Sequence, residues 1–235
     1  FLASDKLDAK LAKYVVLLDA TPKGLAEFAQ QGKAQAALLK RLLADDELMK
    51  QMLVADGARG ERNGPAMKIY TDIQKASKKA KDGVLQRLAL GTSLEHAVPI
   101  KLGKHGPADR PNVDPVKRYL QFEKAYLGGE LDPAFGTFTV WELKFLFGHG
   151  DPDGHLEWGR EMLRNLRPDH IYDAPDAVRY SVIVNTCVKY GSGHVTLDRG
   201  EQFAGANIIQ IGGVCGRRAG MGRFAVRSFG IPATH

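Results

Sequence analysis

Cys215 stands among glycines in the stretch IGGVCGRRAGMGRF, near the end of the 235-residue chain. The thiolate is the nucleophilic form of a cysteine. In the first turn of a helix, unpaired backbone N–H groups and the positive end of the helix dipole favour that form. Gly212 and Gly213 permit a sharp turn before the helix and the close approach of a substrate backbone. The pattern predicts a cysteine nucleophile that begins a helix running from about Cys215 to Phe229.

The expected helix contains three glycines, Gly216, Gly220 and Gly222. Each costs roughly 1 kcal/mol relative to alanine in a helix interior. A helix that tolerates this cost usually lets other elements pack close to it. We therefore expect the side formed by Ala219, Gly222 and Ala225 to be buried. The alternative is a buried, unreactive Cys215, which explains the burial but neither the glycine-rich approach nor the arginines nearby.

The other cysteine, Cys187, lies in the apolar stretch AVRYSVIVNTCVKYG. β-Branched residues favour a strand there, whereas the spacing of Tyr180, Val184, Cys187 and Val188 favours a buried helix. Two cysteines are too few for a disulfide framework. We expect Cys187 to be a core residue that is not bridged to Cys215, because a nucleophile must be free.

The segment GGVCGRRAGMGRFAVRSFGIPA resembles the nucleophile segment of the transglutaminase-like superfamily, which is distantly related to papain-like proteases. The matching positions are Gly213, Cys215, Ala219, Gly230, Ile231, Pro232 and Ala233. The resemblance extends over roughly residues 155–235 and includes the preceding apolar stretch that ends in VKYGSG. It implies the helical half of a cysteine-protease-like α+β domain.

That resemblance also implies the chemistry, which is acyl transfer or amide hydrolysis through a Cys215 thioester. The substrate would be a protein or peptide. The oxyanion would be stabilised by the Cys215 backbone N–H and by an amide side chain, for which Gln210 and Asn207 are the candidates, with Gly213 at the substrate approach. Transglutaminases often have an aromatic residue where this chain has Gly216. The histidine and aspartate of the family lie downstream, so they are expected on residues after His235 or on a second chain.

Three other patterns carry weaker indications of chemistry. The stretch HGDPDGH, residues 149–155, contains two histidines and two aspartates, which are possible metal ligands. Gly154 comes too early for a calcium-binding loop. A turn before a helix also explains this composition. A Gly220-x-Gly222-x-x-Ala225 fingerprint lacks the preceding strand and the later acid of a dinucleotide site. No metal and no cofactor is therefore expected. Four arginines from Arg217 to Arg227 form either a basic face or the solvated side of a half-buried helix.

The first hundred residues show helical periodicity. In DKLDAKLAKYVVLL the expected core face is Leu7, Leu11, Tyr14, Val15 and Leu18. Thr21-Pro22 fits a helix N-cap with proline at the first position. The loop 102–116 is rich in proline, glycine and charge, which predicts a boundary after a helical region over 1–110. The resemblance implies that the second region, 111–235, is the helical half of a transglutaminase-like domain. The chain is expected to be mainly α.

Charge and hydropathy limit the remaining classes of function. Lys and Arg number 33 against 27 Asp and Glu, and this interleaved net charge of +6 favours a solvated surface over a nucleic-acid groove. No apolar run is long enough for a membrane span.

A chain that starts at Phe1 is typical of a processed protein, either secreted or imported into an organelle, and a cytoplasmic location stays possible. Two other functions stay open, a catalytically inactive interaction module and a basic module that binds acidic partners.

Overall fold

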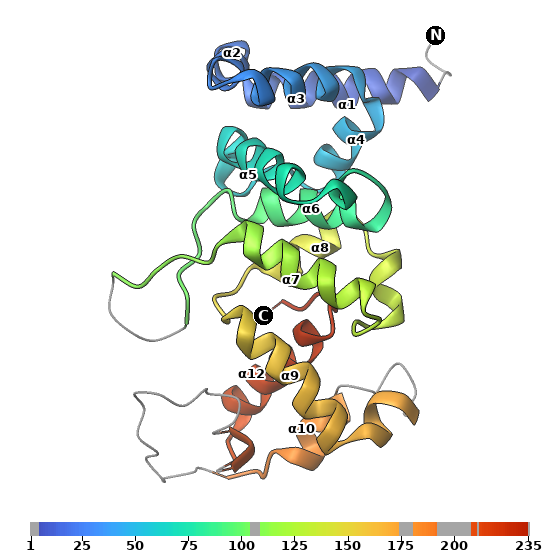
Figure 1. The fold of residues 1–235 in the computed structure, drawn as a ribbon, viewed down its shortest axis with the longest axis vertical. Helices are drawn as coiled ribbons and strands as arrows, with labels where there is room; N and C mark the ends of the chain where they lie inside the picture. The colour runs from blue at the N-terminus through green and yellow to red at the C-terminus, as the bar shows by residue number, and fades with distance from the viewer. Residues whose placement is uncertain (1–4, 104–108, 174–180, 192–207, 211, 235) are drawn as a thin grey trace.

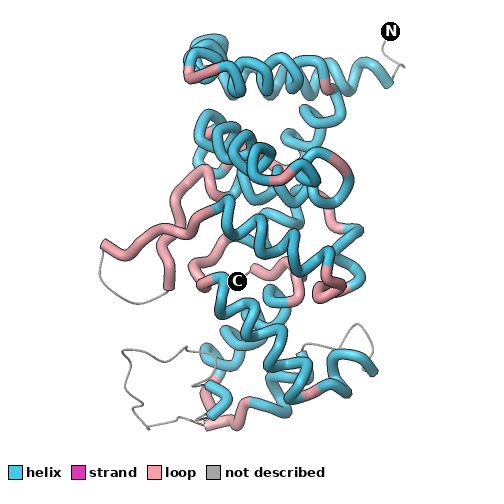
Figure 2. The backbone as a smooth tube through the Cα atoms, viewed as in Figure 1, coloured by secondary structure: helices cyan, strands magenta, loops and turns pink. Residues whose placement is uncertain are grey.

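The computed structural model describes residues 5–103, 109–173, 181–191, 208–210 and 212–234. Within these ranges the backbone is mainly helical and has no strand (Figure 2), which confirms the mainly α prediction. The only extended pairings there are two isolated bridges, Lys101 with Asn112 and Tyr190 with Gly213. None of the described helices combines the length and apolar character needed to cross a bilayer. The cysteine-protease-like part of the fold prediction stays a prediction.

The helices stack along the long axis of the molecule (Figure 1), with α1, α2 and α3 at one end, α5 to α8 in the middle, and α9, α10 and α12 at the other end. The α-helices are α1 (Asp5–Ala20), α2 (Pro22–Gln30), α3 (Lys33–Ala44), α4 (Asp46–Val54), α5 (Asn63–Ala76), α6 (Gly83–Glu95), α7 (Pro115–Leu127), α8 (Val140–Phe147), α9 (Asp153–Leu166), α10 (Ser181–Cys187) and α12 (Cys215–Ser228). Short helical turns are η1 (Arg59–Glu61), η2 (Lys78–Lys81), η3 (Pro133–Thr137) and η4 (Asp169–Asp173).

Local capping explains where several helices begin. The Gly24 N–H donates to Thr21 Oγ1 at 3.1 Å, and Pro22 is the first residue of α2, as predicted. Thr139 and Glu142 form a capping box at the start of α8. That box makes TVWELKFLF a helix, although its apolar pattern alone is equally compatible with a strand. Similarly, Ser181–Cys187 form the helix α10, so the helical spacing of the apolar residues around Cys187 outweighs their β-branched composition.

The centre of the core is α6, which is covered on both sides. Leu88, Leu90 and Leu94 are fully buried. At Gly91 the helix comes so close to α8 that an added Cβ would lie 3.1 Å from Leu143 Cβ. The core continues through α7 to the far end of the molecule, so the helices around the predicted site pack on the same buried cluster. The boundary predicted at residue 110 stays a prediction, and helices from both sides of it pack against one another.

The predicted core face of α1 is wrong at three positions. Leu11, Tyr14 and Leu18 are 52%, 60% and 56% exposed, whereas Ala12 is buried and Val16 packs against the core. The run YVVLL is apolar around most of the helix circumference, so periodicity does not determine which side faces inward. Contact with α4 decides it instead, and it leaves an apolar stripe on the surface.

The helix that carries Cys215 crosses α9 at Gly159. A Cβ added there would lie 2.7 Å from Phe224 Cζ and 2.7 Å from Ser228 Oγ, both on α12. Real Cβ atoms do not approach this closely, so the crossing requires glycine. Near it, Arg160 Nη1 donates to the Ser228 carbonyl at 3.0 Å, which satisfies a carbonyl of the last turn of α12.

Replacing Gly159 with alanine should therefore lower the free energy of unfolding by about 1–3 kcal/mol, because the added methyl group overpacks the crossing. Gly154→Ala in the same helix is the matched control, since nothing lies within 4 Å of its added Cβ. That change should be neutral or raise stability by up to about 1 kcal/mol. Urea denaturation measures both, and equal effects of the two substitutions would contradict the close crossing.

Candidate active site

Cys215 is the first residue of α12, which runs from Cys215 to Ser228 as the sequence predicts. Its thiol is free and its side chain is exposed. Cys187, at the end of α10, is also free and packs partly buried against the core. The prediction that the two cysteines are not bridged is confirmed. Only one of the two thiols is thus presented to solvent at a helix N-terminus.

The turn before Cys215 has no room for a side chain at Gly212 or Gly213. Gly212 has φ +77°, and a Cβ there would lie 2.3 Å from the Lys189 carbonyl oxygen. A Cβ on Gly213 would lie 2.5 Å from Arg217 Cβ. The Gly213 N–H also donates to the Lys189 carbonyl at 3.0 Å, and Gly213 pairs with Tyr190. The two glycines thus let the chain segment after α10 fix the position of the cysteine.

The first turn of α12 keeps its N–H groups available. Val214 is the N-cap and provides no side-chain cap, while its carbonyl accepts the first helical bond from the Arg218 N–H at 3.1 Å. Arg218 holds this end of the helix in place, since its guanidinium donates to the Val188 carbonyl at 2.6 Å and to Asn185 Oδ1. The sulfur of Cys215 therefore lies beside the positive end of the helix dipole.

The small residues of α12 are only partly covered. Ala225 is fully buried, and Gly222 faces Val184 of α10, 3.3 Å from its added Cβ. Ala219 is exposed, which corrects the expectation of a largely buried Ala219–Gly222–Ala225 side at that position. Nothing in the described part of the chain lies within 4 Å of a Cβ added to Gly216 or Gly220. Among the described residues, α9 and α10 pack on the other side of α12 and further along, so Cys215, Gly216, Arg217 and Ala219 are exposed.

The arginines of α12 do not form one basic face. Arg218 is bonded to the residues around α10, and Arg227 is buried, with Nη2 donating to the Ala233 carbonyl at 2.6 Å. Arg217 is the exposed one beside Cys215. This division weakens the basic-module interpretation and leaves local positive charge near the sulfur.

The C-terminal end of α12 explains the Gly-Ile-Pro signature. Gly230 has φ +80°, its N–H donates to the Arg227 carbonyl at 3.0 Å, and the Ile231 N–H donates to the Val226 carbonyl at 3.0 Å. This is a Schellman C-cap, which favours glycine at that position. Pro232 follows where the helix can no longer continue. A Cβ on Gly230 would also lie 2.7 Å from Phe135, so this end is seated against the middle layer.

The other predicted site residues do not come together around the sulfur in the described structure. Gly213 adjoins it through the turn, and Asn207 lies outside the described residues. Gln210 is helical and exposed, and no described hydrogen bond joins it to Cys215. The histidines with described side chains, His96, His149 and His155, are grouped near Arg118, Asp151 and Arg227, at the Ser228 end of α12. Ser228 is about 20 Å from Cys215 along the helix.

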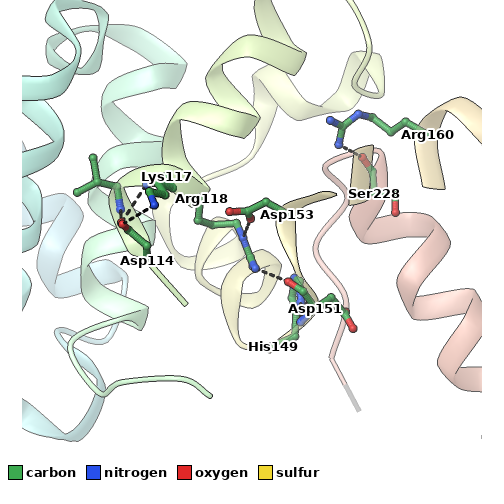
Figure 3. A network of polar contacts seen from close by, with 9 residues as sticks. Asp114, Lys117, Arg118, His149, Asp151, Asp153, Arg160 and Ser228 are labelled. Carbon is green, nitrogen blue, oxygen red and sulfur yellow. Dashed lines mark hydrogen bonds and ion pairs between the residues drawn. The ribbon is translucent and has the colours of Figure 1, made fainter. Parts of the chain in front are cut away.

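A buried polar cluster was not foreseen from the sequence. Arg118 is fully buried and donates to Asp153 Oδ1 and to the Asp151 carbonyl (Figure 3), and His149 Nδ1 lies 3.0 Å from Asp151 Oδ2. HGDPDGH is thus a turn that binds a guanidinium. No group of three or more His, Cys, Asp or Glu side chains in the described ranges is placed to hold a metal. The composition of HGDPDGH indicated polar contacts, but it did not indicate that their partner is Arg118, 33 to 35 residues earlier.

Burial and nearby charges shift the ionisation of this cluster. Desolvation, together with the charge of Arg118, lowers the pKa of His96 to about 3. Desolvation also lowers the pKa of His149, against the opposing effect of its bond to Asp151. Burial alone would raise the pKa of Asp151, but the bond to His149 and the charges of His149, Arg227 and Arg118 hold it below its ordinary value.

Comparison of the chain with protein-family models, with curated proteins and with solved structures gives no match.

Iodoacetamide should alkylate Cys215 faster than Cys187 at pH 6, by at least about tenfold, because its thiol is exposed and faces a helix N-terminus. Peptide mass spectrometry after timed quenching measures the two rates in the same sample. A Cys215 rate equal to or below that of Cys187 would contradict an activated thiol.

Proposed function

We propose that the chain carries the nucleophile of a transglutaminase-like enzyme, which performs thiol-dependent acyl transfer or amide hydrolysis through Cys215. The observation that carries this proposal is an exposed, free thiol on the first residue of a 14-residue helix, held by a turn whose two glycines cannot be replaced without a clash. A structural cysteine has no need of exposure, nor of a built turn before it. The sequence resemblance supports the same role.

In the proposed reaction the Cys215 thiolate attacks the carbonyl carbon of a side-chain carboxamide or a peptide bond. The C–N bond breaks, the nitrogen leaves as ammonia or an amine after it takes up a proton, and a thioester remains on Cys215. A primary amine or water then attacks the thioester and releases the thiolate and the product. The Cys215 backbone N–H would stabilise the oxyanion, with Gln210 or Asn207 as candidates for the second donor.

The proton transfers require a general base near the sulfur. We propose that the histidine and the acid lie on residues that follow His235 or on a second chain, and that this part packs on the exposed side of Cys215, Gly216 and Ala219. Support comes from exposed Ala219 and from the open space at Gly216 and Gly220, which a covering element could approach to backbone distance. No described histidine supports another source for this general base.

The alternative is a transglutaminase-like protein that has lost the chemistry and serves as an interaction module. One observation favours it, the apolar stripe of Leu11, Tyr14 and Leu18 on the surface of α1. Exposed apolar groups at helical spacing commonly mark a contact with another protein. The two candidates differ in whether the intact protein turns over an amide.

Turnover is tested on the full-length natural protein with a glutamine-containing protein as acyl donor and a fluorescent primary amine as acceptor. We expect incorporation of the amine, or release of ammonia when no amine is present. Cys215→Ala should reduce either rate at least about 100-fold, because the covalent route is lost. Cys187→Ala is the matched control and should retain most of the activity.

Cys215→Ala should fold like the wild type, because the side chain that it shortens is exposed. Circular dichroism checks this. Full activity in that variant would exclude the nucleophile role. A folded wild-type protein without turnover of either kind would favour the interaction module instead.

A further inference from the structure

Two buried histidines lie where the middle layer of helices meets the helices α9 and α12. His96 follows the end of α6 and is 4% exposed, and its ring lies 6.3 Å from that of Phe147. His149 lies in the turn between α8 and α9 and is 6% exposed. The Nε2 atom of each ring is buried and has no hydrogen-bond partner. Neither histidine has a role in the proposed chemistry.

The charges around the two rings are balanced only while both rings are neutral. Arg118 of α7 and Arg227 of α12 are buried, and Asp151 and Asp153 beside the start of α9 compensate for them. The charged groups that act on His96 are Arg118 and Arg59, both positive, together with His149. Those that act on His149 are Asp151, Arg118 and Arg227. A proton on His96 would add a positive charge that faces Arg118 and Arg59. A proton on His149 would face Arg118 and Arg227, with the Asp151 carboxylate, 3.0 Å from its Nδ1, as the opposing charge.

The junction combines apolar contacts, such as Gly230 against Phe135, with a set of polar bonds. Arg118 donates to the Asp153 carboxylate and to the Asp151 carbonyl. The Asp132 N–H donates to the Phe229 carbonyl at 2.9 Å, and the Gly103 N–H to the Gly150 carbonyl at 2.6 Å. The polar bonds are the part of the junction that a change of charge weakens, and local opening costs less free energy than global unfolding.

We propose that His96 and His149 make this junction an acid-sensitive latch, which is closed while both imidazoles are neutral and opens on their protonation to release α9 and the cysteine helix α12 from the middle layer. The latch adds regulation by pH to the molecule, whatever reaction Cys215 performs. Its neutral form is the arrangement that the structure describes.

The direction of the pH effect follows from linkage. Above about pH 6.5 a histidine is neutral in both the closed and the open form, so the latch has its full stability. Below that value the open form binds a proton that the closed form excludes, and for His96 this continues down to its closed-form pKa of about 3. Each histidine shifts the equilibrium toward opening by up to about tenfold per pH unit. At pH 5 the two together can shift it up to about 1,000-fold.

Hydrogen exchange read by mass spectrometry at pH 7 and pH 5, corrected for the intrinsic pH dependence of exchange, tests the latch on the wild-type chain. We expect amides in 149–156 and 224–231 to lose protection by up to about 1,000-fold, while α5 keeps its protection as an internal reference. An acid-induced loss that is equal in α5 would overturn the proposal, since it would report global unfolding.

The double variant His96→Gln/His149→Gln should keep the protection of both segments nearly constant from pH 7 to pH 5. His155→Gln is the control, because it removes a histidine from the first turn of α9 outside the cluster and should leave most of the acid response in place. An acid response in the double variant equal to that of wild type would overturn the role of the two histidines. Should the double variant fail to fold, the wild-type exchange pattern decides alone.

Discussion

The close crossing of α9 and α12 at Gly159 is the constraint on which the site depends. With no side chain at that position, Phe224 and Ser228 of α12 rest directly on the backbone of α9. Arg160 then satisfies the Ser228 carbonyl and pairs with Glu130 Oε2 at 3.0 Å, which ties both helices to the end of α7. Once the Ser228 end is fixed, the rigidity of a 14-residue helix determines where its first residue, Cys215, must lie.

Two different kinds of interaction hold the two ends of α12. At the Ser228 end the helix is seated by burial, a Schellman cap and the buried charges of Arg160 and Arg227. At the Cys215 end it is held by backbone bonds to the Lys189 segment and by Arg218, with little burial. The physical consequence is a helix that is well anchored at its Ser228 end and that exposes Cys215, Gly216 and Arg217 at its other end.

Local signals in the sequence were sufficient for the helix that carries Cys215. The glycine pair before the cysteine and Gly230 after the helix each act within a few residues, through backbone conformation and capping, so both helix ends could be predicted. The N-cap at Thr21 and the mainly α character of the chain likewise follow from signals that act within a few residues. Where the outcome depended on distant partners, the sequence was less informative. The exposed side of α1 follows from contact with α4, and the exposure of Ala219 from the side on which α9 packs.

The buried polar cluster shows the same limit more clearly. Arg118 and the HGDPDGH turn are more than 30 residues apart, and neither shows periodicity that would link them. A polar turn was foreseen there, but a guanidinium with no exposed surface was not. The candidate oxyanion residues Gln210 and Asn207 were proposed from composition and resemblance, and the described geometry does not bring Gln210 to the sulfur.

Isolation of a covalent intermediate addresses the nucleophile role of Cys215 most directly. The full-length protein is mixed with a glutamine peptide, quenched in acid within the first turnover and digested, and the peptides are examined by mass spectrometry. The proposed function predicts an acyl adduct on the peptide that contains Cys215, which hydroxylamine removes because it is a thioester. Turnover of the peptide with no adduct on Cys215, or with an adduct on Cys187 alone, would contradict it.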